Sequence, residues 1–279
     1  MTNPKYWLCV GVWSLLGFLP QAYADQASTL SILGGVEPFR WREIDTDKRQ
    51  LLEESGQRYN VAVNFDNLRR LNSGMVYSLG GKLYRGSVDY NGETQLTSIP
   101  VRSTTSYFGV QFDALGGYRF ERHLHGLDLL AGVGVDYWRR SIKDSYVQGV
   151  GPVSGAKEDY FAFNTRLGLG YFHEMGNARH YLQAGLKYPF YVFEYGYQTG
   201  ADNVILHPKG RASLFARYQW EFGSAVRNRW GVSLYYDSYR FSQSNIVIDT
   251  ANGVPTGYII WQPESHQDVY GVQLGFYFR

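Results

Sequence analysis

The sequence has almost no cysteine and, beyond its first two dozen residues, no long apolar run. Its one cysteine, Cys9, lies in the N-terminal apolar segment, so residues 25–279 contain none. This excludes a disulfide scaffold and any thiolate metal site or nucleophile in that part of the chain. No stretch of roughly 18 or more apolar residues follows the leader, which excludes a helical membrane protein.

Charge of one sign is also lacking. The chain carries 27 basic and 25 acidic residues, a net charge of +2, and its mean hydropathy is −0.33. Such a balance gives no case for a nucleic-acid partner. The sequence also has no glycine-rich phosphate loop that follows a strand and opens a helix, so no nucleotide cofactor is expected.

Residues 1–24 have the pattern of a secretory signal peptide. Lys5 is their one charge, 7–19 form an apolar segment, and Ala22, Tyr23 and Ala24 make a small-x-small cleavage site. An N-terminal membrane anchor is the alternative, but the segment is shorter than the ~20 residues that a spanning helix needs. We therefore expect export to the periplasm and a single mature domain at 25–279.

Aromatic residues and glycine are abundant instead. Aromatics make up 17% of the chain, with 24 Tyr, and there are 32 Gly against 9 Pro. From Phe161 to Tyr171 every odd position is apolar except Thr165, while the even positions are small or polar and include Arg166. Since side chains alternate with a period of two along a strand, one face is apolar and the other holds polar groups.

The same alternation recurs along the mature chain and predicts an all-β fold. We expect ten strands, of which the second is marginally short and the first is interrupted at Glu37-Pro38-Phe39. They are Ser31–Arg42, Arg58–Asp66, Gly74–Val88, Ser106–Phe120, Gly126–Arg140, Asp159–His173, Arg179–Tyr197, Gly210–Phe222, Asn228–Phe241 and Gln267–Phe278. Most exceed the ~9–11 residues that cross a bilayer at a tilt.

The connections alternate in length as well. Long stretches follow the odd strands, at 43–57, 89–105, 141–158, 199–208 and 243–266, and short links follow the even ones, at 67–73, 122–125, 174–178 and 223–226. Long outer loops and short periplasmic turns are typical of bacterial outer-membrane barrels. Aromatic residues gather near both ends of the strands, as expected for rings at the two membrane interfaces.

The chain ends on alternating apolar and aromatic residues that resemble the C-terminal assembly signal of outer-membrane barrels: Tyr270, Val272, Leu274, Phe276 and Phe278, followed by Arg279. The mature chain as a whole resembles the bacterial outer-membrane β-barrel superfamily. This resemblance implies a transmembrane antiparallel up-and-down β-barrel of about ten strands, with eight or twelve as alternatives, in the outer membrane of a Gram-negative cell. Outer-membrane lipid and the barrel assembly machinery would be its partners.

The alternation also predicts which charged side chains face the lumen. They are Lys82, Asp113, Arg119, Asp128, Asp136, Arg166, Lys187, Arg217, Glu221 and Asp237, with Glu37 less certain. A ten-stranded barrel is only slightly wider than the eight-stranded barrels that side chains just fill. Acids and bases there can pair into a plug that serves stability, or line a narrow, porin-like passage for small solutes.

The last long loop contains two apolar arms, 245–249 and 257–261, around a turn with Asn252-Gly253. This pattern predicts a hairpin outside the membrane whose arms are too short to span it. We expect it to pack over the barrel mouth as a lid; a sticky edge for a partner is the alternative.

Enzymatic activity has weak support from the residues. Ten-stranded barrels include the omptin proteases. A resemblance to that family would imply a catalytic site of paired aspartates and an Asp/His couple at the outer rim. Here Asp45 and Asp47 form the one Asp-x-Asp, and His207 has no aspartate two residues before it. No histidine lies in the His-x-Ser pair of lipid-modifying barrels, and His123 and His125 alone make no metal site. We therefore expect a non-enzymatic barrel without metal or cofactor, either structural or a narrow pore; a surface-loop binding or adhesion protein is the alternative, with an extracellular or envelope partner.

Overall fold

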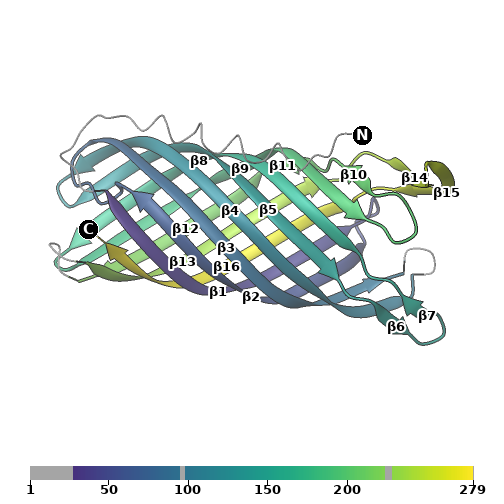
Figure 1. The fold of residues 1–279 in the computed structure, drawn as a ribbon. Helices are drawn as coiled ribbons and strands as arrows, with labels where there is room; N and C mark the ends of the chain where they lie inside the picture. The colour runs from purple at the N-terminus through teal and green to yellow at the C-terminus, as the bar shows by residue number, and fades with distance from the viewer. Residues whose placement is uncertain (1–27, 95–97, 224–227, 279) are drawn as a thin grey trace.

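The computed structural model describes residues 28–94, 98–223 and 228–278. The predicted signal peptide and Arg279 lie outside these residues. Ten long antiparallel strands close into an up-and-down barrel (Figure 1). Within the described residues there is no helix that is long and apolar enough to cross a membrane. The predicted all-β, ten-stranded barrel is thus confirmed.

Consecutive long strands pair with each other around the barrel, and the last pairs with the first. The ten are β1 (Thr29–Ile44), β2 (Gln50–Asp66), β3 (Gly74–Glu93), β4 (Pro100–Arg122), β5 (His125–Ile142), β8 (Lys157–Met175), β9 (Ala178–Tyr197), β12 (Ser213–Phe222), β13 (Arg229–Ser242) and β16 (Glu264–Phe278). β1 closes the barrel by pairing with β16 from Leu30 opposite Phe278 to Ile44 opposite Glu264, with a break at Glu37 and Pro38.

Six short strands lie outside this path or extend it. They are β6 (Ser145–Val147), β7 (Gly151–Val153), β10 (Val204–Leu206), β11 (Lys209–Arg211), β14 (Val247–Ala251) and β15 (Val254–Ile260). β10 pairs with β9 and β11 with β13, while β6–β7 and β14–β15 are separate two-stranded hairpins. Both hairpins project beyond the same end of the barrel (Figure 1). We call this the extended end, and the opposite one, with the links 67–73, 123–124 and 176–177, the short-turn end.

The outer wall carries an apolar belt. On β5 the outward positions run from Leu127 through Leu129 and Val133 to Tyr137, and the next outward residue is Arg139. On β1 they run from Leu30 to Pro38 before Arg40. Because alternate residues of a strand face opposite sides, the same strands can be apolar outside and charged inside. The belt therefore ends where charged residues begin, toward the extended end.

Two predicted long connections prove to be strand. β1 and β2 are joined by residues 45–49, and β3 runs to Glu93 and β4 starts at Pro100, so 43–57 and 89–105 are mainly paired backbone. The second strand is therefore longer than the prediction of Arg58–Asp66. The alternation is hard to see in these stretches because they lie beyond the apolar belt, where the outward positions are polar as well.

The hairpin predicted in the last loop is present, and as a separate sheet it excludes the twelve-stranded alternative. It does not pack down as a lid, however. All of β15 except Ile260 is exposed, including Val254 and Tyr258. The lid prediction is therefore wrong, since these apolar side chains do not pack on the barrel.

Buried rings inside the barrel lie directly on glycines of neighbouring strands. A Cβ at Gly271 would come within 2.1 Å of the Tyr235 ring, and one at Gly109 within 2.3 Å of the Tyr84 ring. Glycine allows this close approach because it has no side chain. These contacts hold large rings flat against the inner wall.

Candidate functional site: a filled lumen

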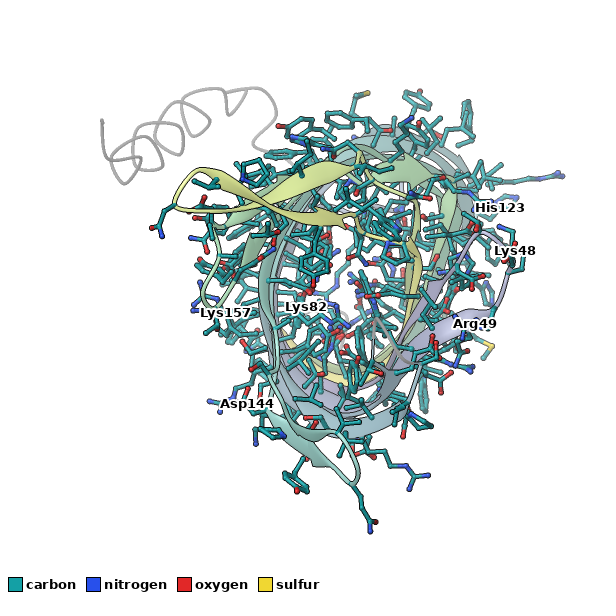
Figure 2. All side chains as sticks on the ribbon, turned by 90° about the vertical axis from the view of Figure 1, so that its right-hand side faces the viewer. Lys48, Arg49, Lys82, His123, Asp144 and Lys157 are labelled. Atoms are coloured by element: carbon teal, nitrogen blue, oxygen red, sulfur yellow. The ribbon has the colours of Figure 1, made fainter. Side chains whose placement is uncertain are left out.

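All ten predicted lumen charges lie on the inward face of the barrel wall. Lys82 points into the lumen when the barrel is viewed along its axis from the extended end (Figure 2). Most of the ten are joined by ion pairs to side chains on other strands, and the pairs form two layers. The ten predicted charges are Lys82, Asp113, Arg119, Asp128, Asp136, Arg166, Lys187, Arg217, Glu221 and Asp237.

The middle layer of the lumen contains a group around Glu37, whose side chain is fully buried. Its Oε2 lies 3.3 Å from the Arg58 guanidinium and 3.3 Å from Lys82 Nζ, and Tyr235 donates to it at 3.1 Å. Arg58 also lies over the Phe39 ring, 4.1 Å from its centroid. A buried carboxylate needs such partners, because removing an ion from water is costly unless it is paired.

A second group completes the same layer. Arg166 lies 2.7 Å from Asp113, and Lys187 lies 2.5 Å from Asp237. Asp136 accepts a hydrogen bond from the Tyr84 hydroxyl at 3.0 Å. Each of these contacts joins strands that lie two apart around the barrel. From the opposite side of the lumen, the Gln111 amide of β4 donates to Asp237 of β13 at 3.3 Å.

The short-turn end is closed by the β2–β3 link folding inward. Arg119 holds Asp128 through two hydrogen bonds of 2.6 Å and donates to the backbone carbonyls of Leu68 and Arg70 in that link. Arg179 also donates to the Leu68 carbonyl. Since a guanidinium offers five donors in a fixed plane, one arginine can bind the wall and the link together.

The other half of the lumen is closed by an aromatic layer. Seven rings from five strands pack there, each at most 3% exposed: Phe39, Trp41, Tyr107, Trp138, Tyr160, Tyr239 and Phe241. The Trp138 and Tyr160 rings are stacked, with centroids 4.8 Å apart and planes 4° from parallel. Closely packed rings exclude water from the part of the lumen that they occupy.

Beyond the aromatic layer, toward the extended end, one arginine is surrounded by glutamates. Arg140 contacts Glu43 at 3.0 Å, Glu54 at 2.9 Å and Glu158 at 2.8 Å. The sequence reasoning missed this group because Glu43 and Glu54 fell in the predicted first loop. The signal that could have found it is the continued alternation of Leu52, Glu54 and Arg58 on one face.

A cavity of about 60 Å³ lies between the middle layer and the inward-folded link, bordered by Asn64, Lys82, Gln183 and Arg217 among others. Arg217 lies 5.9 Å from the Tyr235 ring centroid, and no ion pair to it is seen among the described residues. A space of this size holds a few water molecules and no larger solute.

The predicted enzymatic candidates do not come together. Asp45 caps the β1–β2 turn, accepting from the backbone N–H of Asp47 at 2.9 Å and of Arg49 at 2.8 Å. The Arg49 backbone hydrogen bond, with its guanidinium, lowers the pKa of Asp45. His207 lies 3.4 Å from the Val192 carbonyl instead of a carboxylate. The described residues contain no group of three or more His, Cys, Asp or Glu that could hold a metal.

The β14–β15 hairpin is held at its turn by one carboxylate. Asp202 accepts hydrogen bonds from the Gly253 backbone N–H at 2.8 Å and from the Thr250 hydroxyl at 2.7 Å. These two donors lower the pKa of Asp202, because they favour the charged form. The predicted assembly-signal residues Tyr270, Val272, Leu274, Phe276 and Phe278 all face outward along β16, the strand that closes the barrel.

The solved structures that this chain resembles are bacterial outer-membrane β-barrels. The outer membrane protease OmpT from Escherichia coli has a TM-score of 0.61 and 11% identity, over 91% of this chain and 96% of that one. The transport unit of the Escherichia coli autotransporter AIDA-I has a TM-score of 0.43 and 10% identity, over 95% and 94%. No family model and no curated protein matches the sequence. At these identities the likeness concerns the fold alone, which is that of outer-membrane barrels.

Proposed function

We propose that the chain is an integral outer-membrane barrel without enzymatic activity, that its lumen is closed, and that its function lies in the parts displayed at the extended end. The aromatic layer carries this proposal. A pore needs a continuous column of water, and rings as buried as Trp41 and Trp138 displace it.

The apolar belt supports membrane insertion. Leu129, Leu167, Leu186 and Leu274 are each about half exposed or more, on different faces of one cylinder. Monomeric soluble proteins rarely expose contiguous apolar patches larger than a few hundred Å². A closed sheet also satisfies its backbone hydrogen bonds internally, which is what the lipid interior requires.

The lumen charges support a structural role. Pairs such as Arg119 with Asp128 and Lys187 with Asp237 bind each other at 2.5–2.6 Å, so they are not free to select a passing ion. Removing either partner would leave a buried charge uncompensated. In this role the paired lumen charges fix the barrel's cross-section and bind the inward-folded link.

The test is solute entry into vesicles containing the mature protein. Proteoliposomes diluted into an isosmotic pentose should swell no faster than protein-free vesicles, while a general porin in the same lipid should swell rapidly. Swelling by this barrel would instead support the narrow-pore alternative. Cleavage of peptides by the purified barrel would contradict the non-enzymatic part.

A surface-binding role is the second candidate, and the β14–β15 hairpin favours it. Its exposed side chains include Ile248, Val254, Tyr258 and Ile259. Cells displaying the barrel should partition into hexadecane more than cells displaying Ile248→Ser/Ile259→Ser. Equal partitioning would argue against apolar adhesion through this hairpin.

A further inference from the structure

A row of basic side chains crosses the outer wall at the short-turn end. Strand register places Arg122 of β4 opposite His125 of β5, His125 opposite His173 of β8, and His173 opposite His180 of β9. The next position, on β12, is Trp220. We call Arg122, His125, His173 and His180 the histidine row. Four adjacent strands thus present four nitrogen-bearing side chains at one level.

The rings of this row form a continuous stack. The His125 and His173 centroids are 4.3 Å apart at an interplanar angle of 15°, and those of His173 and His180 are 6.5 Å apart at 20°. His180 is nearly parallel to Trp220, at 6.4 Å and 7°. The imidazoles therefore present their edges side by side along the barrel surface.

Tyrosine hydroxyls fix two of the rings. Tyr171 hydrogen-bonds His125 Nδ1 at 2.7 Å, and Tyr218 hydrogen-bonds His180 Nδ1 at 2.7 Å. Among the described residues, no group hydrogen-bonds the Nε2 of either ring, and His173 Nδ1 is buried without a partner. Where the Tyr hydroxyl donates to Nδ1, the neutral ring carries its N–H on Nε2. In that tautomer the row offers N–H donors to a ligand outside the protein.

No carboxylate neutralises the row from the same face. Glu121 and Glu174 are the nearest acids along β4 and β8, and both occupy the alternate, inward-facing positions; Glu174 accepts from Arg229 at 3.1 Å. Arg122 is exposed, with no ion pair among the described residues. The groups that face the imidazoles are therefore Arg122, the two tyrosines and Trp220, and none of them is an acid.

We propose that the histidine row binds the phosphate headgroup of an anionic phospholipid in the leaflet at the short-turn end. This rests on the proposed membrane insertion of the belt. The row lies at the level of the aromatic residues Tyr171 and Trp220, which mark the lipid–water interface at that end. A phosphate there can accept hydrogen bonds from imidazole and guanidinium N–H groups, which are stronger when the donor is charged.

The proposal predicts a preference for anionic lipid at this part of the wall. Arg122 carries a permanent positive charge beside the imidazoles and is exposed. A cation near a bilayer surface strengthens anionic-lipid binding by roughly fivefold. An anionic lipid should therefore be preferred next to Trp220, and the preference should depend on the imidazoles.

The experiment uses quenching of Trp220 by brominated lipids. Of the tryptophans in the mature chain, Trp41 and Trp138 are buried in the lumen, so Trp230→Phe/Trp261→Phe leaves Trp220 as the one indole that faces lipid. This protein is placed in vesicles of phosphatidylcholine mixed with phosphatidylglycerol, with either lipid brominated. The ratio of the two quenching efficiencies gives the relative binding constant at Trp220.

We expect the brominated phosphatidylglycerol to be favoured over the brominated phosphatidylcholine by roughly fivefold or more. His125→Asn/His173→Asn/His180→Asn should lower this preference and keep the heat-modifiable folded band. His123→Asn, in the β4–β5 turn but outside the row, should leave the preference unchanged. Equal quenching by both lipids would overturn the proposal while leaving membrane insertion intact. No quenching by either lipid would contradict the insertion itself.

Discussion

Replacing Arg119 by methionine tests whether the lumen charges hold the barrel together. The Arg119 side chain is fully buried, binds Asp128 through two 2.6 Å hydrogen bonds and lies 4.2 Å from the Phe172 ring centroid. It also donates to the Leu68 and Arg70 carbonyls of the inward-folded link. One substitution therefore removes the partner of a buried carboxylate and releases the link that closes this end.

The expected cost follows from the charge left behind. Removing one partner of a buried ion pair typically costs about 3–5 kcal/mol, because the other charge stays uncompensated. Tyr181 still donates to Asp128 at 3.1 Å, which reduces the loss only partly. We therefore expect Arg119→Met to lower the free energy of unfolding by about 3–5 kcal/mol. Urea unfolding in lipid vesicles, followed by the loss of the heat-modifiable band, measures it.

A double-mutant cycle makes the reasoning refutable. Arg119→Met/Asp128→Leu leaves no unpaired charge, so it should be less destabilised than the sum of its two single variants by at least about 1 kcal/mol. Arg102→Met, on the exposed outer face of the same strand, should change stability by no more than about 0.5 kcal/mol. Additive single effects, or an Arg119→Met protein as stable as the Arg102→Met control, would refute a stabilising ion-pair plug.

Two further predictions concern the wall and the hairpin. A Cβ at Gly271 would lie 2.1 Å from the Tyr235 ring, so Gly271→Ala should cost about 1–3 kcal/mol in the same urea assay. Gly116→Ala, with nothing within 4 Å, should be nearly neutral, and equal losses would contradict the ring contact. The pKa of Asp202 is lowered in the folded protein. Its contribution to holding the hairpin is therefore fully present when the pH is above the ordinary aspartate pKa, and it is lost as the pH falls through the lowered pKa. The Gly253 amide resonance should therefore shift upfield at acid pH, and Asp202→Asn should produce that shift at pH 7; an unchanged resonance in the variant would contradict the clamp.

The period-two alternation was enough to predict the ten strands and the inward side of each lumen charge. Within the apolar belt the two faces of a strand differ in chemistry, so a residue such as Arg166 can be assigned to one side from its neighbours alone. Beyond the belt both faces meet water or polar groups. For that reason the outer half of β2, with Glu54 inside, looked like a loop.

Contacts that depend on how strands are offset around the cylinder could not be predicted. Arg166 pairs with Asp113 because of the stagger between β8 and β4, which the sequence does not state. The inward fold of the 67–73 link depends on Arg119 and Arg179, which reach it from separate strands. The histidine row likewise exists only through the register of β5, β8 and β9.

Single-channel recording of the mature protein in a planar bilayer tests the closed lumen most directly. With insertion verified by the heat-modifiable band, the membrane current should remain that of the bare bilayer at every voltage at which a porin shows discrete steps. Stable ohmic steps whose ion selectivity changes with Arg166→Ala or Arg217→Ala would contradict a sealed barrel and identify these arginines as the lining of an open pore.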